Sequence, residues 1–278
     1  MLTRVQPMQE KMTYLRPGQL PGVEISQGHF RQFSFAPHVH LDFHIGVVTH
    51  GAQRYRHSGE NLLLHPGKLA TMNPDMVHTG ESADAGDYVT KVLSLPVDWM
   101  TLIAREHGSG EWFFRCGQHT DPQLYHRFVT LHQQLSDPRM PTLALESALI
   151  SLMADMMRSC GENRAEPRDY SLSSPALSRV IDRLHAHPGD DYQLQTLADI
   201  AGLGKYQLLR QFKQTLGITP FAYLQRLRLE HAKKRLHRNE RLCDLACSLG
   251  FYDEAHLNKA FKQAFTVSPS AYRKAMCG

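Results

Sequence analysis

Residues 197–203, LADIAGL, and residues 245–251, LACSLGF, carry one short motif twice in the last third of the chain. Each copy is a short apolar-periodic segment that ends at a glycine and is followed by a second segment of helical periodicity. Two short helices joined by a turn that contains glycine are typical of helix-turn-helix units. The repeat therefore predicts two such units within residues 175–278, a region that we expect to be helical throughout.

The residues between the two copies predict how the units are connected. Gly202 and Gly250 each end the first helix of a copy, where a positive φ angle suits glycine. A long helix is expected over residues 220–238. A rigid helix of this kind would fix the distance between the two recognition helices, which must lie about 34 Å apart to enter successive major grooves on one face of DNA.

The charge distribution sets the same region apart. The 278 residues include 31 Lys+Arg and 27 Asp+Glu, a formal net charge of +4. Residues 175–278 hold 16 basic and 9 acidic side chains, whereas residues 1–174 hold 15 and 18. A basic third joined to a mildly acidic body indicates a module that binds a polyanion such as nucleic acid.

Several other classes of protein are excluded by composition. No stretch approaches the ~18 uncharged apolar residues of a membrane-spanning helix, so we expect no membrane partner. The first residues lack the apolar core of a signal peptide. The five cysteines are odd in number and scattered, which favours reduced thiols in a cytoplasm over a disulfide framework.

The N-terminal half changes character along its length. Residues 22–95 show short apolar runs separated by glycine, proline and asparagine, which predicts a sandwich or small barrel of strands. Helical periodicity follows over residues 121–135 and 142–157. This helix pair either packs on the barrel or forms the seam of a homodimer through residues 121–157. Residues 161–174 are expected to be the linker between a domain at 1–160 and a domain at 175–278.

The repeat region resembles the DNA-binding domain of the AraC/XylS family of bacterial transcription regulators. The resemblance rests on residues 245–251, Leu257, the pair Phe261-Lys262 and the run from Ser268 to Arg273, and the first copy matches as well. Thr266 departs from the glycine that is usual at its position. The resemblance implies a bipartite helix-turn-helix domain that binds promoter DNA, a bacterial cytoplasmic, nucleoid-associated location, and RNA polymerase as a partner.

Helix faces indicate which side chains would contact DNA. Leu208 and Phe212 of the first recognition helix, like Leu257 and Phe261 of the second, are spaced to face the core, so the other faces are available to the groove. Arginine pairs with guanine, glutamine with adenine and glutamate with cytosine. The predicted base-reading residues are Tyr206, Gln207, Arg210, Glu254, Asn258 and Lys259, and the predicted phosphate contacts are Lys213, Arg226, Arg228, Lys233 and Lys262.

Residues 38–45 alternate between histidine or aspartate and apolar side chains, which places His38, His40, Asp42 and His44 on one face of a strand. Together with the later His78, this segment resembles the cupin barrel that serves as the effector domain in many AraC-family regulators. His38, His40 and His78 have counterparts in the cupin metal motif, whereas His44 stands where that motif has an acidic ligand.

Three interpretations of these histidines remain open. They can hold a divalent metal, with His38, His40, His44 and His78 as candidate ligands. They can form a polar pocket for a small effector. They can also be structural and bind nothing. The candidate effector-pocket residues are His38, His40, His44, Tyr55, His57 and His78.

The sequence thus predicts an α+β chain of two domains: a cupin-like β-barrel with a helix pair, then an all-α domain with two helix-turn-helix motifs. We expect a sequence-specific DNA-binding regulator, an activator that responds to a small molecule, with no catalytic residues and no cofactor. The alternative from another class is a cupin metalloenzyme or isomerase, or a metal sensor, that uses the histidine cluster.

Overall fold

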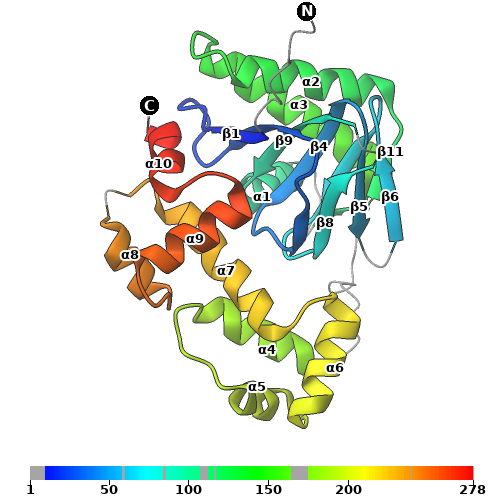
Figure 1. Ribbon diagram of the computed structural model, residues 1–278. Coiled ribbons are helices and arrows are strands. Elements are labelled where there is room, and N and C mark those ends of the chain that lie inside the picture. Colours follow the sequence, from blue (N-terminus) through cyan, green and yellow to red (C-terminus); the bar gives the residue numbers. More distant parts are fainter. Residues whose placement is uncertain are drawn as a thin grey trace, which may run out of the picture.

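The computed structural model describes residues 10–57, 60–83, 86–106, 112–115, 117–163, 175–238 and 240–277. A β-rich part precedes residue 164 and a helical part follows residue 174, and the two lie against each other (Figure 1). This is the predicted α+β class with two domains. Within these residues no helix combines the length and apolar character needed to cross a bilayer.

The β-rich part consists mainly of two antiparallel sheets. The larger has the order β1 (Lys11–Leu15), β2 (Glu24–Phe30), β9 (Tyr88–Leu95), β4 (Phe43–His50), β7 (Leu69–Met72) and β11 (Gly117–His119). The smaller has the order β3 (Phe35–His38), β8 (His78–Ser82), β5 (Gln53–His57) and β6 (Glu60–Leu64).

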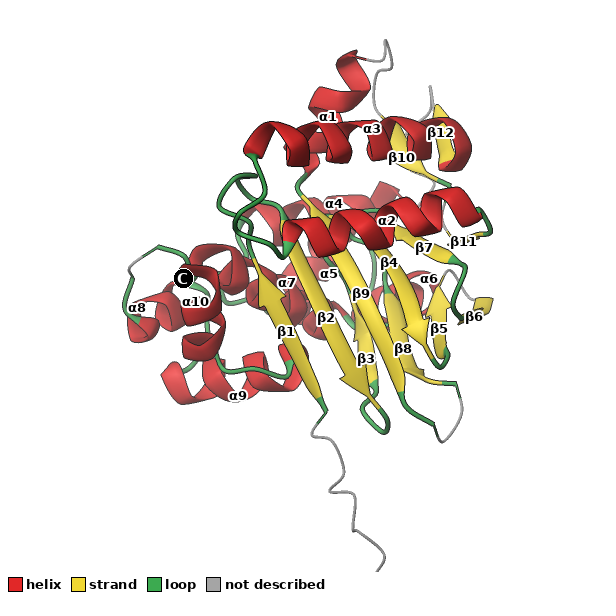
Figure 2. Cartoon of the chain, turned by 90° about the horizontal axis from the view of Figure 1, so that it is seen from above, coloured by secondary structure: helices red, strands yellow, loops and turns green. Residues whose placement is uncertain are grey.

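Along β4, alternate side chains show which face of the larger sheet packs against helices and which faces the smaller sheet. Phe43, Ile45 and Val47 are buried in a core shared with the helices α1 (Val97–Glu106), α2 (Pro122–Leu135) and α3 (Thr142–Cys160). Figure 2 shows α2 lying across this sheet. Because successive side chains of a strand point to opposite faces, His44 and Gly46 face the space between the two sheets.

The helix pair of residues 121–157 packs on the sheet of its own chain. Leu145, Leu149 and Leu152 of α3 are at most 1% exposed and belong to the same core as Leu124 and Phe128 of α2. Of the two alternatives for this helix pair, these side chains fit packing on the barrel, because they are already covered within one chain.

The predicted start of the linker also needs correction. β12 (Gly161–Asn163) pairs antiparallel with β10 (Trp112–Phe114), so residues 161–163 belong to the N-terminal domain. The remainder of the predicted linker, residues 164–174, lies outside the described residues.

The helical part contains the two predicted repeats on either side of one long helix. Each repeat has its own core, built around Leu208 and Phe212 in the first and around Leu257 and Phe261 in the second. The helices are α4 (Pro175–Ala186), α5 (Leu194–Ala201), α6 (Lys205–Leu216), α7 (Pro220–Arg235), α8 (Leu242–Ser248), α9 (Glu254–Phe265) and α10 (Pro269–Cys277).

Helix ends follow the sequence expectation with one informative exception. Gly202 and Gly250 have φ angles of 69° and 72°, as expected for residues that end the first helix of each repeat. Gly217 ends α6 at φ 75°, but the corresponding residue after α9 is Thr266, at φ 63°. A β-branched side chain is strained in this region, and the buried Oγ1 of Thr266 has no hydrogen-bond partner among the residues that the structure describes.

Replacing Thr266 by glycine is expected to raise the free energy of unfolding by about 1 kcal/mol, because glycine adopts a positive φ without strain. Urea unfolding of the two proteins measures this difference. The reciprocal change, Gly217→Thr, is the matched control and should destabilise. A loss of stability in Thr266→Gly would contradict the assignment of strain.

Candidate functional site

The space between the two sheets is a pocket whose wall includes the helical domain. The cavity has a volume of about 110 Å³. Strands of both sheets provide most of the lining, and α7 and α9 add Arg226, Lys233, Ala264 and Phe265. A concave site lined mainly by apolar side chains with a few polar groups is typical of a site for a small organic molecule. The structure therefore places a single cavity in contact with both domains.

Most of the predicted pocket residues line this cavity. The lining includes His38, His40, His44, Tyr55 and His78. His57 is 5% exposed and lies on β5 opposite His78, but it is not part of the lining.

The histidines divide into a group of three and a single ring. Nitrogen atoms of His38, His40 and His78 all lie within 4.8 Å of one another. His44 instead stacks on His40, with ring centroids 3.7 Å apart, and its Nε2 lies 2.8 Å from Ser94 Oγ. Of the four candidate metal ligands, three converge and one does not.

The surroundings favour the neutral form of all four imidazoles. Burial lowers the pKa of His38, His40 and His44 well below the usual value for histidine, and neighbouring positive groups act in the same direction. Burial also lowers the pKa of His78, to about 4. The pocket thus presents polar but uncharged rings on the barrel side.

The positive charges of the pocket come from α7. The Arg226 side chain is 8% exposed, donates from Nε to Val39 O at 3.1 Å and pairs with Glu230 at 2.9 Å. Lys233 is 9% exposed, and its Nζ lies 2.6 Å from Glu24 Oε1 on β2. Both are therefore held at the domain interface.

These positions do not fit the predicted phosphate contacts of Arg226, Arg228 and Lys233. A phosphate contact needs an exposed cation, whereas all three are buried. Arg228 donates to the carbonyl oxygens of Pro188, Gly250 and Asp190, each at 2.8 Å, and so ties the two helix-turn-helix units together. Lys213 and Lys262 are exposed.

Further polar contacts join the domains around the pocket. Lys234 donates to Asp42 at 2.7 Å, and Tyr14 donates from its hydroxyl to the carbonyl of Phe265 at 3.2 Å. Tyr272 of α10 donates to Glu24. Burial and the Glu24 carboxylate raise the pKa of Tyr272 well above its usual value, so the hydroxyl keeps the proton that it donates.

Sequence reasoning missed Glu24 and Glu230, the acidic partners of this interface. Glu230 follows Arg226 by four residues, a spacing that signals an ion pair on one helix. Glu24 carries no such signal, because Lys233 and Tyr272 lie more than 200 residues away in the chain. Its third partner, Arg16 at 3.7 Å, is eight residues earlier and not at a helical spacing.

The predicted base-reading residues lie mostly on exposed helix faces. Tyr206 is 79% exposed, and Gln207, Arg210, Glu254 and Lys259 are also exposed, whereas Asn258 is half-buried. Figure 1 shows α6 and α9 at opposite ends of α7, with axes that point in different directions. One straight duplex cannot receive both helices in equivalent major grooves until their directions agree.

Comparison with known families decides the class of this protein. A sequence model of the AraC-like ligand binding domain matches residues 20–153, and a model of a helix-turn-helix domain matches residues 197–275. The chain belongs to the AraC family of transcription regulators. It is a regulator with a ligand-binding domain and a DNA-binding domain, and not an enzyme, so the metalloenzyme alternative is set aside.

Individual relatives agree with this assignment. The HTH-type transcriptional regulator YbfI of Bacillus subtilis is 27% identical over 231 residues, covering 80% of this chain and 81% of the relative. The HTH-type transcriptional activator RhaS of Enterobacter sp. (strain 638) is 28% identical over 254 residues, covering 87% and 89%.

Solved structures share the two-domain fold. ToxT from Vibrio cholerae matches with a TM-score of 0.57 at 9% identity, covering 92% of this chain and 99% of ToxT. A structure of ToxT bound to an unsaturated fatty acid matches with a TM-score of 0.56 at 10% identity, covering 96% and 97%. At this identity the likeness concerns the fold alone.

Proposed function

We propose that this regulator changes its occupancy of promoter DNA when a small organic acid binds in the barrel pocket. The observation that carries the proposal is that Arg226 and Lys233 of α7 line the same cavity as the barrel histidines. A ligand there touches the helix that connects the two DNA-binding units, so binding and DNA recognition share one structural element.

The lining favours an acid with an apolar body. Leu64, Met72, Val92 and Phe265 offer aliphatic and aromatic surface, and the two α7 side chains offer positive charge. A carboxylate pairs well with arginine and lysine where water is excluded. ToxT, which has the same fold, binds an unsaturated fatty acid.

The anionic group would compete with the protein's own carboxylates. Arg226 and Lys233 are paired with Glu230 and Glu24, which hold α7 on the barrel. A ligand carboxylate that takes over these cations would loosen that contact and allow α6 and α9 to align. The shift requires only that the acid bind the aligned arrangement more tightly than the docked one.

On DNA, the aligned helices would occupy successive major grooves. We propose base contacts by Tyr206, Gln207, Arg210, Glu254, Asn258 and Lys259 and phosphate contacts by Lys213 and Lys262. Two units in one chain allow a monomer to bind a bipartite site. A homodimer through residues 121–157 would have to use the outer faces of α2 and α3.

We base the proposed effect on transcription, activation or repression, on the relatives of this chain. Relatives such as RhaS are activators. We propose that this chain also activates transcription, through contact with RNA polymerase, in a bacterial cytoplasm.

Thermal-shift screening of the whole chain tests the effector class. Straight-chain fatty acids and aromatic carboxylic acids are expected to raise the melting temperature, because a ligand that binds the folded state stabilises it by mass action. Neutral sugars and amino acids should have little effect. Lys233→Met should abolish the shift, whereas Lys234→Met, the neighbouring lysine outside the pocket lining, should retain it. A shift produced by sugars alone, or one that survives Lys233→Met, would count against an acid.

The DNA side is tested with a duplex selected from a random pool by the wild-type chain. Arg210→Ala is expected to cost about 1–3 kcal/mol on that duplex and to relax one base position, whereas Lys213→Ala should weaken binding to all duplexes alike. Fluorescence anisotropy measures both. An equal loss for Arg210→Ala on selected and random DNA would show that Arg210 does not read a base.

A further inference from the structure

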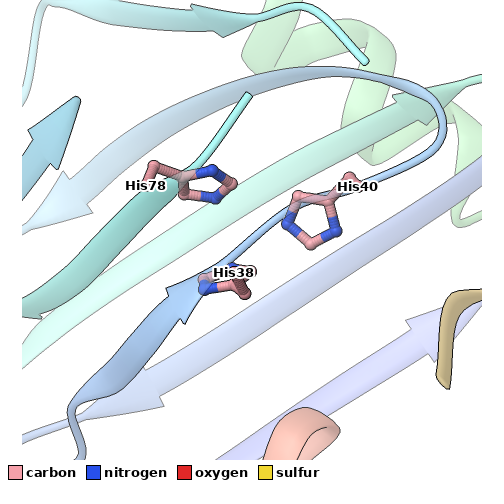
Figure 3. A group of neighbouring side chains, drawn as sticks. All are labelled: His38, His40 and His78. Atoms are coloured by element: carbon pink, nitrogen blue, oxygen red, sulfur yellow. The ribbon is translucent and has the colours of Figure 1, made fainter. Parts of the chain in front are cut away.

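Three histidines from different segments meet at the pocket wall. His38 ends β3, His40 follows it in the connection to β4, and His78 begins β8 (Figure 3). The ring centroids of His38 and His78 lie 4.2 Å apart, and His40 lies 4.9 Å from the first and 5.0 Å from the second. Neutral imidazoles do not attract one another as a charged ring would attract an acceptor. Their close approach therefore calls for an explanation.

The Nδ1 atom of each ring is already engaged. In His38 it donates to Ala36 O at 2.7 Å, and in His78 to Met76 O at 3.0 Å. In His40 it lies 3.0 Å from a carboxylate oxygen of Glu230. Carbonyl and carboxylate oxygens only accept, so each Nδ1 carries the proton and each Nε2 carries a lone pair. These bonds fix both the tautomer and the ring orientation.

We propose that the Nε2 atoms of His38, His40 and His78 bind one divalent transition-metal ion, with Glu230 of the DNA-binding domain supporting His40 from behind. A metal-bound histidine characteristically donates its other nitrogen to a backbone carbonyl or a carboxylate. All three rings show this arrangement. Bonds of about 2.0–2.1 Å require the nitrogens to approach somewhat more closely, which small side-chain rotations provide.

The donor set selects the class of ion. Imidazole nitrogen suits Zn²⁺, Co²⁺, Ni²⁺ and Fe²⁺, whereas Mg²⁺ and Ca²⁺ require oxygen. His44, bonded through Nε2 to Ser94, is left outside the set, and a fourth coordination position would face the pocket.

The charges around the site indicate what such an ion would favour. Arg226 and Lys233 are balanced by Glu230 and Glu24, so a divalent ion adds uncompensated positive charge to a buried pocket. An anionic ligand relieves this charge.

The site also reaches the DNA-binding domain. A metal on Nε2 makes the Nδ1 proton of His40 a stronger donor to Glu230, which lies on α7. Metal binding should thus hold this segment of α7 more firmly on the barrel. This regulatory consequence rests on the proposed function, whereas the site itself does not.

Titration of the chelator-treated, dialysed whole chain with Co²⁺ tests the site. We expect one equivalent per chain, a visible absorption band of low-symmetry Co²⁺ that Zn²⁺ abolishes, and a rise in melting temperature. His78→Ala should lower the affinity at least 100-fold, and Glu230→Gln should lower it 10–100-fold. His65→Ala, an exposed histidine outside the cluster, should bind as the wild type does. Absence of a stoichiometric band in the wild-type protein, or an unchanged affinity in folded His78→Ala, would overturn the proposal.

Hydrogen exchange of the same samples tests the connection to α7. Zn²⁺ should slow exchange in residues 220–235 of the wild-type chain and have little effect there in Glu230→Gln. Unchanged exchange in a metal-loaded wild-type chain would overturn the coupling and leave the site standing. Neither measurement uses DNA or an organic acid, so failure of the proposed function would not be mistaken for failure of the metal site.

Discussion

Two buried carboxylates, Glu24 on β2 and Glu230 on α7, fix the relation between the two domains. Glu24 faces Lys233 and Tyr272, and Glu230 faces Arg226 and His40. Removing one member of such a buried pair leaves a charge without compensation and commonly costs 3–5 kcal/mol. The interface is therefore stable only while its charges stay matched. An anion that enters the pocket and pairs with Arg226 or Lys233 in place of these carboxylates changes the charge balance of the interface directly.

This constraint explains why α7 is buried around most of its surface. Tyr223, Leu224 and Leu227 pack into the core of the first DNA-binding unit, and Leu229 and Ala232 pack into that of the second. Arg226 and Lys233 complete the pocket wall. One helix therefore contacts both recognition units and the proposed effector. Ligand contacts in the pocket therefore act directly on the helix that sets the relative placement of α6 and α9, which is the physical basis of the proposed coupling.

The sequence predicted local features well and long-range ones poorly. The repeated glycine turn identified both helix-turn-helix units. The prediction that His38, His40 and His44 share one strand was wrong, because they lie at the end of β3, in the following connection and on β4, although all three line the pocket. The basic residues of α7 were wrongly interpreted as phosphate contacts, because a helix pattern does not show which charges a distant carboxylate will bury. The partners of Lys233 and Lys234 come from another domain. For the same reason the apolar stripe of α3 was compatible with both a dimer and the chain's own sheet, and the edge strand at 161–163 resembled a linker.

The central claim is that the charge pairs on α7 hold the two recognition helices out of a common DNA-reading arrangement. The most direct test is the DNA affinity of the double variant Glu24→Gln/Lys233→Met, which removes both members of one pair and leaves only the partly exposed Arg16 without its contact to Glu24. Measured without added ligand, it should bind a duplex with both half-sites about ten-fold more tightly than the wild type, roughly 1.4 kcal/mol, and a duplex with one half-site equally well. Wild-type affinity on both duplexes, in a double variant that is folded, would contradict the account.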